Sequence, residues 1–151
     1  MALHFSKQEF EKRKLATLKS MKEQNLDALL MFRQESMFWL TGYDTFGYVF
    51  FQTLILDQKG NIILLTRAPD LRQAQNTSNI EDIRIWVDKD QSNPTDDLKI
   101  ILNELNLKGK KIGIEYEAYG MTGRNALRLN KSLKGYCEVE DQSELITKHR
   151  V

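Results

Sequence analysis

The chain has few of the residues that build covalent cross-links or metal sites. Its 151 residues include one cysteine, Cys137, and two histidines, His4 and His149, at opposite ends. A single cysteine cannot form an internal disulfide, and an isolated terminal histidine is rarely a metal ligand. We therefore expect a protein of a reducing compartment with no metal site of its own, and we interpret Cys137 as a small apolar side chain.

Signals for export, membrane insertion and nucleic-acid binding are also missing. The N-terminal residues 1–10 lack the apolar core of a signal peptide, and no uncharged run approaches the roughly 20 residues needed to cross a bilayer. Lys and Arg total 22 against 21 Asp and Glu, and no basic block is interleaved with aromatic residues. These features predict a cytoplasmic protein without membrane or nucleic-acid partners.

Common catalytic motifs are absent as well. There is no HExxH, CxxC, GxSxG or GxGxxG pattern, and no Walker loop precedes Gly109. The sequence thus predicts no catalytic residue. One alternative is a small enzyme whose acid and base come from Asp44, Asp70 or Glu115, although no paired arrangement of these carboxylates is visible.

Half of the aromatic residues lie between residues 35 and 71, and this segment organises the chain. Gly42 predicts a turn after an aromatic cluster, and the apolar runs 48–56 and 62–66 flank a polar turn, which predicts an antiparallel strand pair. The side chains of Phe50, Leu54 and Leu56 are expected to lie on the same side of the strand and to point into the core. A helix then opens near Pro69 and runs to about residue 77.

The remaining segments alternate between helix and strand patterns. Helices are expected after the N-caps Ser6, Asn93 and Thr122, and strands at residues 27–32, 83–87, 111–115 and 136–139. The apolar run 27–32 has the pattern of a central strand covered on both faces. This alternation predicts an α/β domain with a mixed sheet and helices on both faces.

Several blocks resemble a known domain in their order and spacing. The sequence WLTGY at 39–43, a hairpin ending in LTR at 65–67, and Asp70 three residues later resemble the N-terminal domain of the creatinase and Xaa-Pro peptidase family, which includes prolidase and aminopeptidase P. Further blocks agree at residues 10–13, 25–30, 112–115 and 145–150. The resemblance implies a three-layer α/β/α fold with a central mixed sheet, a ribonuclease H-like motif, over residues 1–151.

The resemblance also implies a function. Members of the family hydrolyse peptides before proline, or related amide-like bonds, in a C-terminal pita-bread domain that commonly holds a pair of divalent metals. That catalytic domain is expected to be absent from this chain and to be its partner. The chain would be a non-catalytic domain that supports a homodimer and borders the active site. The alternative is a free-standing α/β binding or interaction module without peptidase activity.

Five residues are the candidates for that border, because the N-terminal domain lies beside the active site in the resembling enzymes. They are Tyr43, Asp44, Phe46, Arg67 and Asp70. Phe46 or Tyr43 would wall the substrate pocket, and Arg67 would bind a substrate carboxylate through its planar guanidinium. The competing interpretation makes the aromatic residues core or interface and Arg67 with Asp70 an ion pair at a helix start.

The aromatic cluster of residues 38–51 is too large for one strand to bury. Aromatic side chains are enriched at protein contacts because they bring a large apolar area with few rotatable bonds. We therefore expect the isolated domain to expose an apolar patch or to associate with itself.

Overall fold

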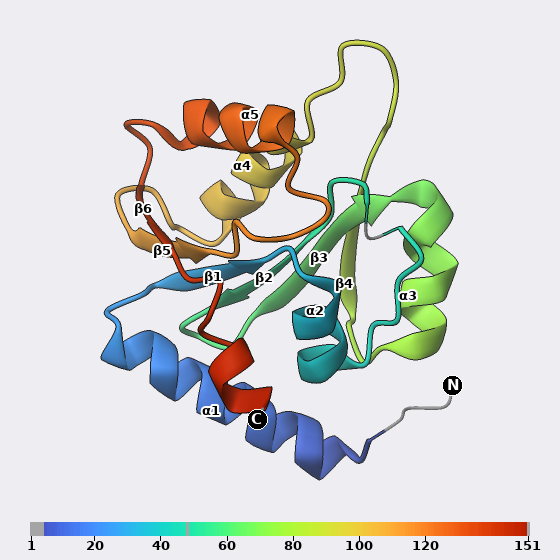
Figure 1. The fold of residues 1–151 in the computed structure, drawn as a ribbon, viewed down its shortest axis with the longest axis vertical. Coiled ribbons are helices and arrows are strands. Elements are labelled where there is room, and N and C mark those ends of the chain that lie inside the picture. The colour runs from blue at the N-terminus through green and yellow to red at the C-terminus, as the bar shows by residue number, and fades with distance from the viewer. Residues whose placement is uncertain (1–4, 48, 151) are drawn as a thin grey trace.

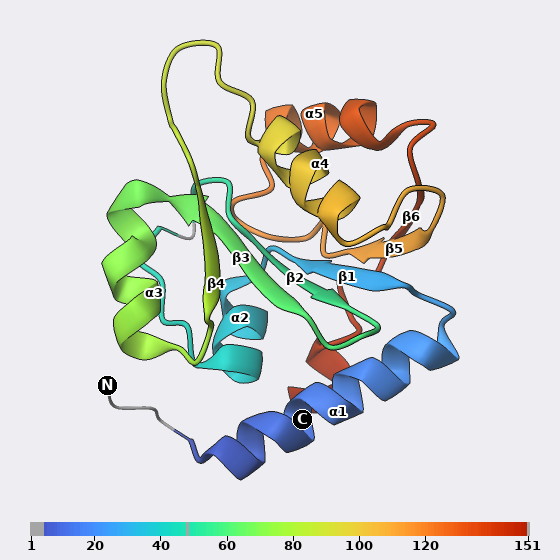
Figure 2. The same ribbon diagram turned by 180° about the vertical axis from the view of Figure 1, so that it is seen from behind.

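The computed structural model, which describes residues 5–47 and 49–150, contains a mixed six-stranded sheet with the strand order β4-β3-β2-β1-β5-β6 (Figures 1 and 2). The strands are β1 (Ala28–Met31), β2 (Thr53–Asp57), β3 (Ile62–Arg67), β4 (Asp82–Trp86), β5 (Lys111–Ile114) and β6 (Glu138–Asp141). β1 pairs antiparallel with β2 and parallel with β5. The predictions of a mixed sheet and of a central β1 are confirmed.

Helices cover both faces of this sheet and make it the middle of three layers. The helices are α1 (Lys7–Glu23), α2 (Gln34–Thr41), α3 (Leu71–Thr77), α4 (Pro94–Glu104) and α5 (Gly123–Leu133), with 3-10 turns η1 (Ala68–Asp70) and η2 (Thr147–Arg150). Helices α1, α2 and α3 lie on one face, and α4 and α5 lie on the other (Figure 1). The predicted three-layer α/β/α architecture is confirmed.

Each face of the sheet has its own hydrophobic core, because strand side chains alternate between the faces. Leu54 and Leu56 of β2 pack in a cluster with Met37 of α2, whereas Ile55 packs in the opposite cluster with Leu102 of α4. All five side chains are fully buried. The alternation of side chains along the strands therefore divides the apolar interior into two separate cores.

The predicted helix starts are also present. The side chains of Ser6 at α1 and Thr122 at α5 each accept a hydrogen bond from the backbone amide three residues later, and that of Asn93 at α4 accepts one from the amide two residues later. Phe5 and Phe10 pack edge to face across the first turn of α1, with ring centroids 5.9 Å apart. The three cap hydrogen bonds satisfy amides that a helix leaves unpaired at its N-terminus, and the ring contact packs the chain before α1 against its first turn.

Three expectations need correction. Residues 34–41 form helix α2, which the sequence did not predict and which ends at Gly42 with φ of 84°. The strand expected over residues 48–56 begins only at Thr53, and Phe50, expected in the core, is 43% exposed. The edge strand expected at 136–139 is β6, displaced by two residues toward the C-terminus. Tyr48 lies outside the described residues.

Two further features bear on the sequence predictions. Cys137 is partly buried and packs against the core cluster under α4 and α5, where burial raises the pKa of its thiol. Within the described residues, none of the helices combines the length and apolar character of a membrane span.

Candidate functional site

The segment between α2 and β2 covers a buried polar cluster, which we call the Tyr43 cluster and which comprises Tyr43, Thr45, Gln52 and Thr66. The Tyr43 hydroxyl donates to Oε1 of Gln52 at 2.8 Å and lies 3.1 Å from the Thr45 hydroxyl. The same Gln52 oxygen accepts from the Thr66 hydroxyl at 3.1 Å. Burial raises the pKa of Tyr43, so the phenol stays neutral and serves as a donor.

Asp70 closes this cluster from the start of α3. Its Oδ2 lies 3.4 Å from the Thr66 hydroxyl and 3.6 Å from Nε of Arg67. The backbone of Gly47 lies directly against the same carboxyl group: a side chain at residue 47 would place its Cβ only 2.6 Å from Oδ1 of Asp70. A close backbone approach of this kind requires glycine. The loop is therefore fixed to the start of α3.

Arg67 connects the loop to two acidic residues. Its guanidinium lies 3.6 Å from Asp70 and 3.7 Å from Asp88, and its Cζ is 3.6 Å from the centroid of the Phe50 ring. Nε of Arg67 is buried and makes no hydrogen bond with the described residues. The geometry includes the ion pair of the competing interpretation, because both carboxylates lie within ion-pair distance of the guanidinium.

The structure brings three of the five predicted border residues together. Tyr43, Arg67 and Asp70 meet under the loop, because Gln52 and Thr66 link the Tyr43 hydroxyl to the Asp70 carboxyl group, which pairs with Arg67. Phe46 lies apart, with 79% of its surface exposed. Asp44 is exposed, and its backbone amide and carbonyl are bonded to side chains of α3. No observation on this chain tests contact with a substrate, so the border role remains a prediction.

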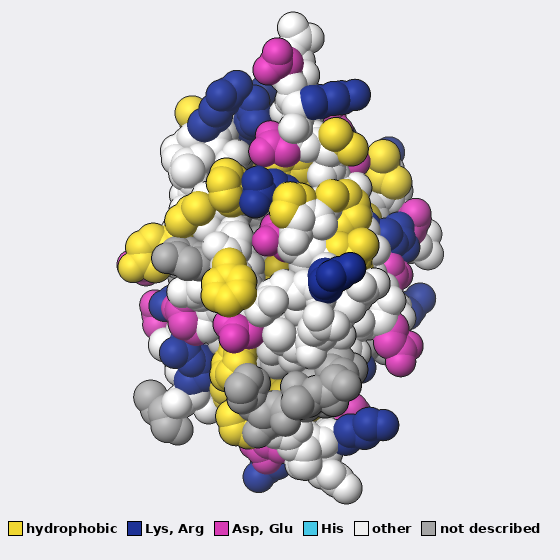
Figure 3. All heavy atoms as spheres, turned by 90° about the vertical axis from the view of Figure 1, so that its right-hand side faces the viewer, with side chains coloured by type: hydrophobic (Ala, Val, Ile, Leu, Met, Phe, Trp, Pro, Cys, Tyr) yellow, Lys and Arg dark blue, Asp and Glu magenta, His cyan; other side chains and the backbone are white. Residues whose placement is uncertain are grey.

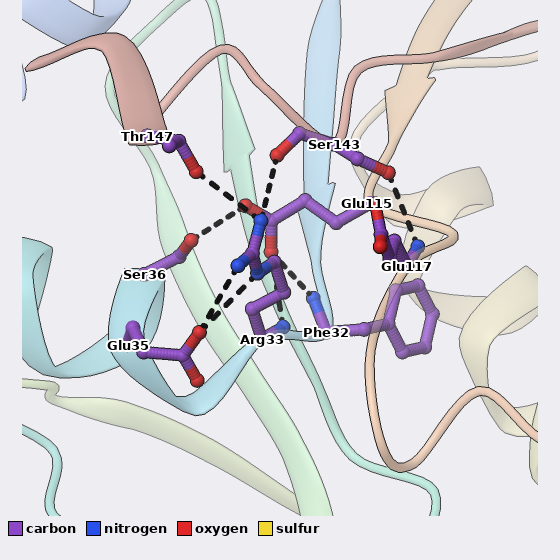
Figure 4. Close-up of polar contacts among 8 residues, drawn as sticks. All are labelled: Phe32, Arg33, Glu35, Ser36, Glu115, Glu117, Ser143 and Thr147. Carbon is purple, nitrogen blue, oxygen red and sulfur yellow. Dashed lines mark hydrogen bonds and ion pairs between the residues drawn. The ribbon is translucent and has the colours of Figure 1, made fainter.

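A second polar site lies at the ends of β1 and β5, and the sequence singled out only one of its members. Glu115 is fully buried after β5 and accepts hydrogen bonds from the backbone amides of Phe32 and Arg33, each at 3.0 Å, and from the Ser36 hydroxyl at 2.5 Å (Figure 4). Burial raises the pKa of Glu115 to about 7, although these hydrogen bonds act in the opposite direction. The available signal was an acidic residue directly after the apolar run 112–114.

Arg33 joins this site to the C-terminal segment. Its Nε and Nη2 donate to Oε2 of Glu35 at 3.3 and 3.2 Å, and its Nη1 donates to the Ser143 carbonyl and the Thr147 hydroxyl, each at 3.2 Å (Figure 4). The guanidinium thus makes four hydrogen bonds within the domain. We call the segment 32–36 with these partners the β1–α2 corner.

A pocket of about 390 Å³ opens at this corner. It is lined by Phe32, Arg33, Gln34, Glu35, Glu117, Ala118 and Tyr119. These lining residues include none of the five predicted border residues. Among the described residues, at this pocket and in the rest of the domain, no three Asp, Glu, His or Cys side chains lie close enough together to ligate a metal ion. We therefore assign no metal site to the described residues.

Comparisons with known proteins agree on one family. The sequence model described as the Creatinase/Prolidase N-terminal domain matches residues 13–151. The protein named uncharacterized hydrolase/peptidase y4tM, from Sinorhizobium fredii, is 28% identical over 138 residues. The match covers 87% of this chain and 35% of that relative, so the chain spans about a third of its length.

Solved structures show the same fold at lower identity. A dipeptidase from Pyrococcus horikoshii is 22% identical with a TM-score of 0.72, and the match covers 91% of this chain and 36% of that one. An Xaa-Pro aminopeptidase from Streptococcus thermophilus is 18% identical with a TM-score of 0.72, covering 94% and 98%. The N-terminal domain of an Xaa-Pro dipeptidase from Lactobacillus brevis is 11% identical with a TM-score of 0.71, covering 91% and 98%.

Proposed function

The chain belongs to the creatinase/prolidase N-terminal domain family, and we propose on this premise that it is the non-catalytic N-terminal domain of an Xaa-Pro dipeptidase-like or creatinase-like metallohydrolase. In this proposal residues 1–151 support a homodimer and border the active site of a separate catalytic domain, which would carry the pair of divalent metals. The match to about a third of a longer hydrolase/peptidase supports a domain that works beside another one.

The observation that carries the proposal is a set of exposed apolar side chains, here called the loop surface: Phe46, Val49 and Phe50 in the loop before β2, and Val87 directly after β4. Their exposed fractions are 79%, 49%, 43% and 63%. Figure 3 shows the side of the molecule that lies on the right in Figure 1, and apolar side chains are exposed there between charged ones. Large exposed apolar groups are typical of contact sites.

The loop surface is held in place before any partner arrives. The close approach of Gly47 to Asp70 and the buried phenol of Tyr43 fix the loop that carries Phe46. A loop whose backbone is already fixed loses less conformational entropy when a partner covers it. The loop surface is therefore suited to act as an anchor in an interface.

The dimer part of the proposal is tested by sedimentation velocity on the chain and two variants over a wide range of concentrations. We expect the unmodified chain to associate and Phe46→Ser to remain monomeric. Leu127→Ser is the matched control, because Leu127 is 73% exposed on α5, away from the loop surface. A monomer at every concentration, or equal association of all three proteins, would count against the loop surface as the contact.

The border part of the proposal is tested in the full-length enzyme. We propose that Phe46 walls the substrate side of the loop, with Asp44 beside it, while the buried Tyr43 supports the loop from beneath. We also propose that Arg67, paired with Asp70, binds a substrate carboxylate. Arg67→Ala is then expected to raise KM, whereas Arg72→Ala, an exposed residue on α3, leaves it unchanged. Unchanged KM and kcat in Arg67→Ala would remove the proposed role.

The sequence of the gene beyond residue 151 tests the premise of a separate catalytic domain. An open frame that carries Asp, Asp, His, Glu and Glu in metal-ligand order supports the proposal, and a stop codon favours the free-standing module. Hydrolysis of an Xaa-Pro dipeptide by the purified chain would contradict its non-catalytic role.

A further inference from the structure

The pocket at the β1–α2 corner lies where two parallel strands send their chains to opposite faces of the sheet. β1 and β5 are neighbours in parallel register, with Leu30 opposite Ile114. After β1 the chain enters α2, and after β5 it leads to α5 on the other face (Figure 1). In open α/β sheets, the crevice outside the carboxyl ends of strands at such a divergence is the usual ligand position. The volume of about 390 Å³ is adequate for a small ligand.

Both walls of the pocket are fixed by hydrogen bonds within the domain. On the β1 side, Glu115 binds the backbone amides of Phe32 and Arg33. On the β5 side, the backbone amide of Glu117 donates to the Ser143 hydroxyl at 3.1 Å. A ligand would therefore enter a site whose backbone is already positioned, which lowers the entropy lost on binding.

The charges along the pocket determine which ligand it suits. Arg33 and Glu35 form an ion pair at 3.2 Å, and the guanidinium is further occupied by bonds to the C-terminal segment. Among the described lining residues, the charge left outside this pair is that of Glu117, which is exposed. An acidic group beside the exposed aromatic side chain of Tyr119 favours a cation, because the face of an aromatic ring attracts positive charge.

We propose that the pocket at the β1–α2 corner binds an ammonium group carried by a peptide, with Glu117 as its counter-charge and Tyr119 as its aromatic wall. This site is distinct from the loop surface and does not depend on the proposed dimer or on a catalytic domain. The ammonium group can come from a lysine side chain or from a free peptide amino terminus, and the test separates the two sources.

The test is a titration of the isotope-labelled 151-residue chain, followed by the NMR signals of its backbone amides. The probes are N-acetyl-lysine methylamide and alanine methylamide, which carry a side-chain and an α-ammonium group. N-acetyl-norleucine methylamide is the neutral control for the first and N-acetyl-alanine methylamide for the second. We expect an ammonium probe to shift the signals of residues 33–35 and 117–119, with an affinity of about 1 mM for the lysine probe of about 14 non-hydrogen atoms and weaker binding for the smaller alanine probe.

Substitutions then assign the counter-charge. Glu117→Gln is expected to weaken binding of the preferred ammonium probe about two- to fivefold, the range for an exposed ion pair. Glu138→Gln should bind as the unmodified chain does, because Glu138 is exposed opposite Lys111, at the other end of β5. Whichever ammonium probe binds more tightly identifies the source.

Three results would overturn the proposal. The first is equal binding of the ammonium probes and their neutral controls, which would show that the pocket binds the apolar part of the probe and does not recognise the ammonium group. The second is unchanged affinity in Glu117→Gln. The third is an absence of signal shifts at the pocket with either ammonium probe.

Discussion

The buried carboxyl group of Glu115 makes the stability of this domain depend on pH. Burial raises the pKa of Glu115 from 4.5 to about 7, so the folded state binds its proton more tightly than the unfolded state does. A group with a raised folded-state pKa stabilises the fold fully below its unfolded pKa, and this contribution is lost as the pH rises through the folded pKa. The domain should therefore lose stability between mildly acidic and mildly basic pH.

The magnitude follows from the size of the pKa shift. A shift of one unit corresponds to about 1.4 kcal/mol, so the move from 4.5 to about 7 corresponds to roughly 3 kcal/mol in total. Part of this is already lost at pH 5, which leaves a decrease of roughly 2.5 kcal/mol between about pH 5 and pH 8. Glu115 is fully buried, so solvent screening reduces the effect little.

The perturbation that tests this is Glu115→Gln. The amide stays neutral at every pH, its oxygen still accepts from the backbone amide of Phe32 or Arg33, and its nitrogen can donate to the Ser36 hydroxyl. The free energy of unfolding is measured by urea denaturation at several pH values. We expect the free energy of unfolding of the unmodified protein to fall as the pH rises, and this fall to be nearly abolished in the variant. The variant should therefore gain most in stability, relative to the unmodified protein, at basic pH.

Glu117→Gln is the matched control, because it removes the same charge from an exposed residue two positions later. It should keep the full pH dependence of the unmodified protein. A Glu115→Gln variant with an undiminished pH slope would refute the reasoning, and so would an unmodified protein with equal stability at about pH 5 and pH 8.

Three further substitutions test the other contacts by thermal or urea denaturation. Gly47→Ala should destabilise the fold by about 1–3 kcal/mol, because the new Cβ would meet the Asp70 carboxyl group. Gly123→Ala is the control and should not destabilise the fold, because the space around residue 123 is open. Equal effects of the two substitutions would contradict the close approach of Gly47 to Asp70. Tyr43→Phe should lose about 1 kcal/mol by removing the phenol from the buried cluster, and no loss would mean that the hydroxyl is dispensable. Asn93→Ala should lose about 1 kcal/mol with the N-cap of α4, and an unchanged midpoint would show that the cap contributes nothing.

The elements that the sequence predicted well are those whose signals are local. The caps Ser6, Asn93 and Thr122 bond to amides only two or three residues away, so a short window of sequence contains both partners. The apolar alternation of β2 and β3 is equally local, and it gave the hairpin and the two faces of the sheet. The resemblance to a known family supplied the order of the layers.

Helix α2 was missed because its start depends on a distant residue. Its N-cap, Arg33, provides no side-chain cap, and the amides before the helix are bound by Glu115, more than 80 residues later. The strand start was misplaced for a similar reason. Aromatic and β-branched residues between 48 and 52 favour a strand, but Asp70 holds the loop at Gly47 against α3 and delays pairing until Thr53.

The candidate site was predicted only in part. The proximity of Tyr43, Arg67 and Asp70 follows from a loop and a hairpin end that the sequence placed next to each other. The exposure of Phe46 could not be derived, because it depends on how the loop turns away from the core. The pocket at the β1–α2 corner required the parallel pairing of β1 with β5, a contact between segments about 80 residues apart.

The bonds of Arg33 and Glu115 also constrain the order in which the polypeptide can complete its fold during translation. A ribosome releases the amino end first, so residues 28–41 emerge long before Glu115 and longer still before Ser143 and Thr147. Until those later residues are synthesised, the amides of Phe32 and Arg33 lack their carboxylate acceptor and the guanidinium lacks its C-terminal partners. The nascent chain therefore completes its centre only when nearly all of the domain has been made.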